Sequence, residues 1–135
     1  MTQADVCREQ VVRALEIAGW IVYPDEFMLR IGRRHRLYID IEAFLPADRS
    51  IMIVEVKCFQ DKAAQTTELY TAIGQYLIYQ SFLDQRGINT PLYLAVPTSA
   101  YAGIFQRMAM PVIQRNHVKM IIVDMGREVI ERWIE

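Results

Sequence analysis

The chain has 135 residues, of which 53% are hydrophobic, and its formal net charge is −1. This length predicts a single domain over residues 1–135, with a core large enough to fold without disulfides or a structural metal. The balanced charge excludes a strong overall attraction to nucleic acid or membrane, so any contact with DNA must come from a local basic patch.

The two cysteines, Cys7 and Cys58, match no zinc-binding spacing and no CxxC pair. The polar N-terminus lacks the apolar segment of a signal peptide, and no apolar run approaches the ~20 residues that span a bilayer. We therefore expect a cytoplasmic protein with reduced thiols and no membrane association. Because no base adjoins Cys58, it is expected to be a buried structural thiol rather than a nucleophile.

The first quarter of the chain predicts one helix and then short strands. Residues 3–18 have the apolar spacing of a helix, and Gly19 is a plausible stop. Residues 20–23 are β-prone up to Pro24, and residues 27–31 continue this strand or form a short second one. The apolar face of the helix is expected to consist of Cys7, Val11, Ala14, Leu15 and Ala18.

A β-hairpin is predicted next, with arms at residues 37–45 and 51–57 and a turn at residues 46–49. If the turn is centred on its two middle residues, Asp40 lies directly opposite Glu55. Paired residues of an antiparallel hairpin point to the same side, so these two carboxylates are expected to be neighbours.

The alternation of side chains along the two arms assigns their faces. Lys57 has the same parity as Glu55, so Asp40, Glu55 and Lys57 are expected on one face of the hairpin. On the first arm, Ile39 and Ile41 are expected together on the opposite face. A register slip of two residues would leave this arrangement intact.

The next segment predicts a long helix over residues 66–85, followed by a buried parallel strand over residues 92–97. Gln75 and Tyr79 are four residues apart, so they lie on one edge of the apolar stripe of this helix. That stripe is expected to consist of Leu69, Ala72, Ile73, Tyr76 and Leu83.

The last third predicts a helix and two closing strands. Thr98 or Ser99 is expected to cap the helix, and Pro111 to interrupt or restart it. Residues 118–124 and 129–134 are typical of strands. The whole order, α-β-β-β-α-β-α-β-β, predicts an α/β fold with a mixed sheet flanked by helices.

The ordered set of an aspartate, a Glu-x-Lys and a Gln-x-x-x-Tyr is typical of a metal-dependent nuclease. Mg²⁺ or Mn²⁺ would bind the carboxylates of Asp40 and Glu55 and the backbone carbonyl of Val56, since hard cations prefer oxygen ligands. Lys57 would lie beside the attacking water and stabilise the developing negative charge. The alternative is an ordinary solvated strand, but Ile51 and Ile53 share this face, and charges on a buried face need partners.

The Gln-x-x-x-Tyr pair would complete this catalytic set from the long helix. Gln75 would orient Lys57 or a phosphate oxygen, and Tyr79 would lie below it in the same stripe. On its own this pair is a weak signal, because an amphipathic tyrosine is often simply part of the core.

The only dense basic cluster precedes the Asp40 strand. Arg33, Arg34 and Arg36 are predicted to contact DNA phosphates, with Arg30 and His35 beside them. A solvated loop tip explains the same residues equally well.

This constellation resembles the PD-(D/E)xK, or restriction-endonuclease-like, superfamily in its Gln-x-x-x-Tyr variant. More narrowly, nearly the whole chain resembles the XisH family, the fdxN-element excision controlling factors. The segments that carry this resemblance are residues 18–20, 37–40, 54–57, 71–76, 92–97 and 133–134.

The resemblance implies a restriction-endonuclease-like fold and a role in controlled excision of a DNA element. The family is expected to act with DNA, a site-specific recombinase and the companion factor XisI. Ile39 stands where the superfamily name has a proline. The superfamily often places a further metal-binding glutamate on the first helix, for which Glu9 is the nearest candidate, although it lies opposite the apolar face.

Three functions remain open from the sequence. The first is a factor that binds DNA and cuts it with a divalent metal. The second is a catalytically inactive regulator with the same fold that binds a recombinase or companion factor. The third, a small-molecule enzyme, is disfavoured because no Gly-rich phosphate loop or nucleophile elbow is present. Assembly into a homo-oligomer is compatible with each of them.

Overall fold

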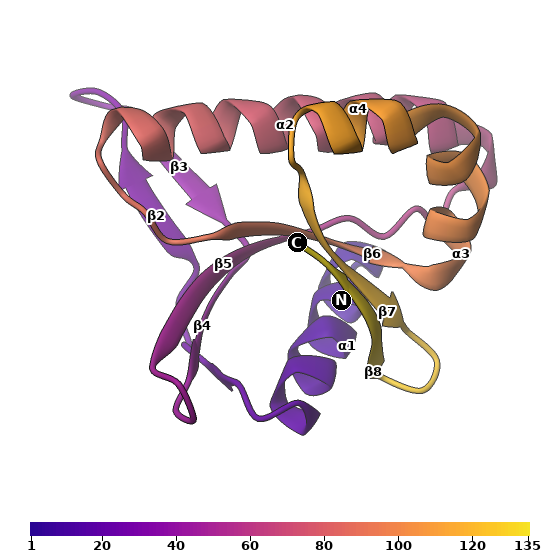
Figure 1. Cartoon of the computed structure of the whole chain (residues 1–135), viewed down its shortest axis with the longest axis horizontal. Helices are drawn as coiled ribbons and strands as arrows, with labels where there is room; N and C mark the ends of the chain where they lie inside the picture. The colour runs from indigo at the N-terminus through magenta and orange to yellow at the C-terminus, as the bar shows by residue number, and fades with distance from the viewer.

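The computed structural model describes residues 1–135 as a mixed α/β fold (Figure 1). Its helical segments are α1 (Gln3–Ile17), η1 (Lys62–Ala64), α2 (Gln65–Gln85), α3 (Thr98–Ala100), the π-helix η2 (Tyr101–Ala109) and α4 (Met110–Arg115). Its strands are β1 (Ile21–Val22), β2 (Phe27–Arg30), β3 (Arg36–Ile39), β4 (Ile41–Leu45), β5 (Ser50–Val56), β6 (Leu92–Pro97), β7 (Lys119–Asp124) and β8 (Val129–Ile134).

Helix α1 begins and ends where its local sequence predicts. Thr2 and Asp5 form a reciprocal capping box at its start. Gly19 follows its last turn with φ +96°, a conformation that costs glycine little. The predicted apolar face is buried with the exception of Ala18, which is exposed because the helix has already ended.

A six-stranded mixed sheet in the order β1-β4-β5-β6-β7-β8 forms the centre of the molecule. Strands β5, β6 and β7 are parallel, and the other pairs are antiparallel. All residues of β6 are buried, as its continuous apolar sequence predicts. The β4–β5 register pairs Ile41 with Val54 and Leu45 with Ser50. This confirms the predicted register, because its next step places residue 40 opposite residue 55.

The predicted single strand over residues 37–45 is wrong, because the chain bends at Asp40. Strand β3 pairs with β2 in a separate two-stranded sheet, while β4 joins the main sheet. The bend reverses the parity of the side chains: Ile39 joins one hydrophobic cluster and Ile41 joins the other. The predicted placement of these two residues on one face is therefore also wrong.

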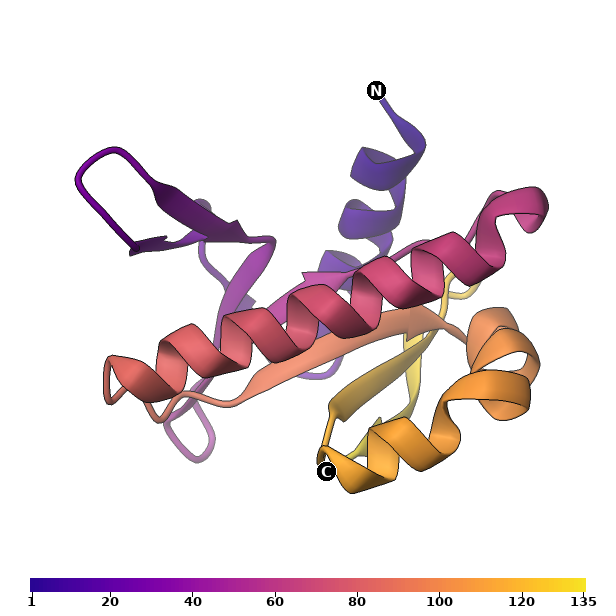
Figure 2. The same ribbon diagram turned by 90° about the horizontal axis from the view of Figure 1, so that it is seen from above.

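Helices cover both faces of the main sheet (Figure 1). Helix α2 runs along β6, with the segment from α3 to α4 beside it (Figure 2). The larger hydrophobic cluster lies between these helices and the sheet, and includes Leu69, Tyr76 and Phe105. The smaller cluster lies under α1 and includes Val11 and Leu15. Four of the five residues predicted for the α2 stripe are buried, and Ile73 is half-buried.

The remaining predictions hold in part. Pro111 lies in the first turn of α4, and β7 and β8 form the predicted antiparallel pair. Neither Thr98 nor Ser99 caps a helix, because Pro97 occupies that position and no side chain bonds there. The predicted order contained three strands between the first two helices, whereas the structure has five. No helix combines the length and apolar character needed to cross a bilayer.

Candidate active site

A cleft of about 520 Å³ lies where α1, the Asp40 bend and the end of β5 meet. Asp40, Glu55, Val56 and Lys57 line it, so the structure brings together the residues that the hairpin register predicted to share a face. The cleft also contains Arg8 from α1. Two local features create this arrangement: the bend that ends β3 and the position of Glu55 and Val56 at the end of β5.

The Asp40 carboxylate is held by the backbone of β5. Its Oδ2 accepts a hydrogen bond of 2.8 Å from the N–H of Val56. In a strand, the N–H and the C=O of one residue point to the same edge. On the other edge of β5, the N–H of Lys57 donates to the carbonyl of Ala95. Regular strand geometry therefore puts the Val56 carbonyl on the Asp40 side of β5, where a third oxygen ligand is expected.

Glu55 is the only buried charged residue, with 6% of its surface exposed. Burial and then the charge of Asp40 raise its pKa from 4.5 to about 7, while Lys57 acts in the opposite direction. The Lys57 Nζ lies 3.4 Å from Glu55 Oε2, and both side chains are largely shielded from solvent. Glu55 and Asp40 therefore repel one another across the cleft, while the Lys57 ammonium attracts Glu55.

The donor set fits a hard divalent cation. Two carboxylates and one carbonyl supply oxygen, and a cation between the carboxylates would relieve the repulsion that raises the Glu55 pKa. No group of three or more His, Cys, Asp or Glu side chains has metal-binding geometry. A cation held here would keep several water ligands, as Mg²⁺ commonly does.

Gln75 and Tyr79, both on α2, do not line the cleft. The Gln75 Oε1 is buried without a hydrogen-bond partner. Burial, and then the charges of Glu55 and Asp40, raise the pKa of Tyr79 to about 12. The two carboxylates therefore act on Tyr79 electrostatically, which places this residue of α2 next to the site. The structure shows no hydrogen bond from Gln75 to Lys57.

Glu9, the candidate third carboxylate, does not reach the cleft. Its side chain is half-exposed and lies 4.0 Å from Arg13 on the outer face of α1. Residue 9 lies on the outer side of the helix, as its position opposite the apolar face indicates, whereas residues 7 and 11 face the core.

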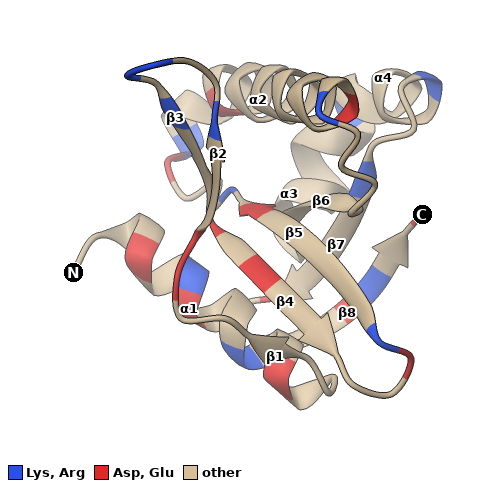
Figure 3. Ribbon diagram, turned by 90° about the vertical axis from the view of Figure 1, so that its left-hand side faces the viewer, with Lys and Arg blue, Asp and Glu red and all other residues tan.

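The basic cluster is also more remote than predicted. Arg33, Arg34 and Arg36 are exposed at the tip of the β2–β3 hairpin, and Figure 3 shows this tip far from the end of β5. Asp40 lies at the opposite end of the four-residue strand β3, which is about 13 Å at 3.3 Å per residue. The three arginines do not line the cleft.

Arg8, Glu26 and Glu68 are among the cleft residues that local sequence patterns did not indicate. The Nε of Arg8 donates to the backbone carbonyl of Asp40 at 3.2 Å. Because Phe27 pairs with Ile39, the next step of that register places Glu26 opposite Asp40. The β2–β3 register is thus the signal that could have identified Glu26 as a neighbour of Asp40. Arg8 and Glu68 depend on how two helices dock, which local patterns do not reveal.

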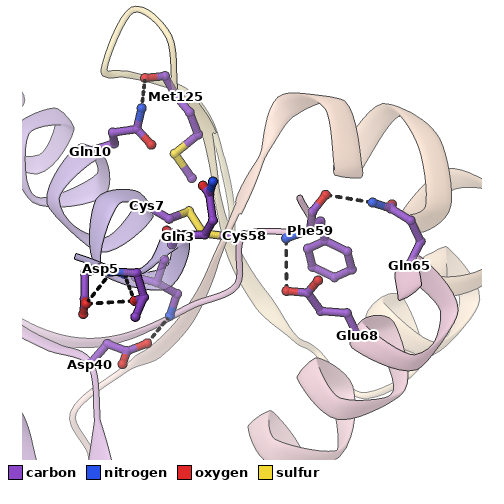
Figure 4. Close-up of a disulfide and its surroundings, with 12 residues drawn as sticks. Gln3, Asp5, Cys7, Gln10, Asp40, Cys58, Phe59, Gln65, Glu68 and Met125 are labelled. Atoms are coloured by element: carbon purple, nitrogen blue, oxygen red, sulfur yellow. Dashed lines mark hydrogen bonds between the residues drawn. A yellow bond between two sulfur atoms is a disulfide. The ribbon is translucent and has the colours of Figure 1, made fainter. Parts of the chain in front are cut away.

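A disulfide joins Cys7 of α1 to Cys58, the residue after Lys57 (Figure 4). The Cα atoms are 6.0 Å apart, a normal span for such a bond. The prediction of two reduced thiols is wrong, because docking of α1 brings together cysteines that are 51 residues apart. The bond fixes α1 to the lysine end of the cleft.

Comparisons with known proteins place this geometry in context. The sequence profile described as XisH protein matches residues 1–131. The crystal structure of an XisH family protein from Nostoc punctiforme PCC 73102 is 34% identical, with a TM-score of 0.84, and the alignment covers 97% of this chain and 100% of that one. The structure of an fdxN element excision controlling factor protein from Anabaena variabilis is 33% identical, with a TM-score of 0.85 and coverage of 97% and 99%. A search of curated protein sequences finds no significant match.

Proposed function

Because this chain belongs to the XisH family, we propose that it is a controlling factor for the site-specific excision of a DNA element. Its relative from Anabaena variabilis is described as an fdxN element excision controlling factor, and the alignment spans nearly the full length of both chains. The companion factor XisI and a site-specific recombinase are the protein partners that this family membership suggests.

The fold and the cleft support a restriction-endonuclease-like assignment, with chemistry on a phosphodiester. One observation carries this proposal: Asp40, Glu55 and Lys57 converge in a single cleft that Val56 also lines. Asp40, Glu55 and Val56 would hold Mg²⁺ or Mn²⁺, which activates water and neutralises phosphate charge.

The protein's own groups have separate roles in this proposal. The Lys57 ammonium is 17% exposed and stabilises negative charge that develops on the phosphate. Arg8 presents a guanidinium to the same cleft, where no carboxylate forms an ion pair with it. Gln75 and Tyr79 support the site from α2. Arg33, Arg34 and Arg36 contact DNA phosphates outside the cleft.

A specific observation favours the second candidate, an inactive regulator that binds a recombinase or companion factor. The cleft also contains the carboxylates of Asp5, Glu26, Asp61 and Glu68, and the chain has no net positive charge. Such surroundings repel phosphates more than they repel a protein partner.

A cleavage assay distinguishes these candidates. Wild type, Asp40→Asn and Lys57→Met are incubated with duplex, branched and single-stranded DNA in Mg²⁺, Mn²⁺ or EDTA. Metal-dependent cleavage by wild type that both variants lose supports the nuclease. Excision that persists in cells carrying either variant, together with no cleavage by wild type in any metal, establishes the regulator.

A further inference from the structure

A second cavity, of about 500 Å³, lies at the other end of β5. Ser50, Ile51 and Met52 line it, whereas residues 55–57 line the candidate active site. The two ends of this strand are about 20 Å apart at 3.3 Å per residue. The second cavity therefore has a separate chemistry and does not depend on the proposed function.

Three aromatic rings shape this cavity, which we call the aromatic cavity and which Trp20, Tyr93 and Trp133 line. The rings of Trp20 and Trp133 are 6.1 Å apart with an interplanar angle of 33°. Tyr93 is 5.4 Å from Trp133 and nearly perpendicular to it, at 85°. The three rings therefore pack against one another as one wall of the cavity. A ring face that remains open to the cavity attracts a cation, because it carries negative charge density.

The charged groups of the aromatic cavity have the same sign as those ring faces. Asp48 and Glu135 are its only charged residues. The backbone N–H of Ser50 donates to Asp48 Oδ1 at 3.0 Å, and the Tyr93 hydroxyl donates to Glu135 Oε1 at 3.2 Å. Burial and then Glu135 raise the pKa of Tyr93 to about 12, so this hydroxyl remains a donor at neutral pH.

These observations favour a cation over a stacked nucleotide as the ligand of the aromatic cavity. Aromatic side chains also stack on bases, but proteins that bind nucleic acid in this way combine the rings with basic residues along the phosphates. No lysine or arginine lines the aromatic cavity, and both of its charges repel phosphate.

We propose that the aromatic cavity binds the guanidinium of an arginine side chain presented by a partner protein. Guanidinium is planar, weakly hydrated and able to stack on an indole while donating to carboxylates, whereas ammonium is compact and strongly hydrated. Leu45 and Ile51 supply apolar contacts for residues that flank the arginine in the partner.

The test uses the two tryptophans of the chain, both of which line the aromatic cavity. Their indole N–H resonances and their fluorescence therefore report on this site alone. The probes are an acetylated Gly-Arg-Gly amide, its lysine counterpart and its citrulline counterpart, which is neutral and nearly isosteric. The arginine peptide is expected to shift both indole resonances saturably, the lysine peptide to bind at least about threefold more weakly, and the citrulline peptide to cause no saturable shift.

Matched variants test the role of the carboxylates. Asp48→Asn with Glu135→Gln is expected to weaken binding of the arginine peptide about threefold to tenfold. Glu16→Gln with Glu131→Gln changes the net charge equally at exposed positions outside the cavity and should leave the affinity unchanged. Equal binding of the citrulline peptide, unchanged affinity in the cavity variant, or stronger shifts with oligothymidylate than with the arginine peptide would overturn the proposal. The last outcome would identify a nucleotide-stacking site.

Discussion

The carboxylate of Asp40 accepts a 2.8 Å hydrogen bond from the backbone N–H of Val56, which fastens the bend between β3 and β4 to the last residue of β5. Val56 lies between Glu55 and Lys57 in the sequence. The same bond therefore holds an acidic group beside the carboxylate and the ammonium of the cleft, and it ties the β2–β3 hairpin to the main sheet.

Two substitutions at this position separate its structural role from its charge. Asp40→Ala removes the acceptor and is expected to lower the free energy of unfolding by about 1–3 kcal/mol. Asp40→Asn keeps an oxygen acceptor and removes the repulsion with Glu55, so its effect should be smaller. Urea denaturation at pH 8 measures both. Equal losses would show that the hydrogen bond contributes no stability.

Glu55 should make the stability depend on pH. Its pKa in the folded protein is about 7, against an ordinary value of 4.5, so the folded state binds more protons between these two values. Stability is then expected to fall as the pH rises from about 4.5 to about 7 and to level off above this range. The measurement is the free energy of unfolding of wild type minus that of Glu55→Gln, at pH 5 and pH 8.

In the difference between wild type and Glu55→Gln, the contributions of all groups that titrate in both proteins cancel. Added Mg²⁺ at pH 8 should raise the stability of wild type and leave Glu55→Gln unaffected, because a ligand stabilises only the state that binds it. A difference that is independent of pH would show that Glu55 is ionised without penalty.

Lys57→Met keeps the apolar stem of the side chain and removes its charge. Without the ammonium, the Glu55 pKa should rise above its wild-type value, because Lys57 acts to lower it. Folding should remain largely intact, with a loss of at most a few kcal/mol, since Glu55 can protonate instead of remaining an unpaired charge. Any nuclease activity should disappear. Carbon-13 NMR titration of the Glu55 carboxyl measures the shift, and Lys62→Met, an exposed lysine outside the cleft, is the control.

The hairpin arginines are expected to contact phosphates without reading sequence. Replacing Arg33, Arg34 and Arg36 with alanine should flatten the slope of log K against log salt on duplex DNA by about 0.9 for each lost contact. Affinity measured across a salt series tests this. A matched triple alanine variant at Arg107, Arg115 and Arg127, which are also exposed, should change the slope less. Identical slopes in both variants would show that the hairpin tip does not contact DNA phosphates and is either solvated or in contact with a protein.

Reduction of the bond between Cys7 and Cys58 should destabilise the protein. The cysteines are separated by 51 residues, and a bond that closes a loop of this size typically contributes about 2–4 kcal/mol by restricting the unfolded chain. Urea denaturation with and without dithiothreitol measures the loss. The Cys7→Ser, Cys58→Ser double variant should resemble reduced wild type and be insensitive to the reductant. Insensitivity of wild type would mean that the thiols are unpaired in solution.

Local patterns predicted the elements that make up the main sheet and the pairing that forms the cleft. The turn at residues 46–49 was sufficient to set the register that places Asp40 opposite Glu55, because hairpin pairing follows directly from turn position. The continuous apolar run of β6 likewise identified a buried central strand.

Features that depend on tertiary contacts were not predictable in this way. Alternation continues through Asp40, so nothing local marks the bend that separates β3 from β4. Arg8 reaches the cleft, and Cys7 reaches Cys58, only because α1 docks against the end of β5. The catalytic roles of Gln75 and Tyr79 remain predictions.

The separate β2–β3 sheet has a further consequence for how the sequence of such a protein can evolve. Strands β1 and β4 pair directly, through Ile21 with Phe44 and Val22 with Ala43. The main sheet is therefore complete without the β2–β3 hairpin, which is topologically an insertion between two adjacent strands. The exposed tip of such an insertion can be lengthened or given other charges without altering the register of β4 and β5, while Leu29 and Ile39 hold its base in the core. Specificity for a new target could thus evolve in the hairpin while the carboxylates of the cleft stay in place.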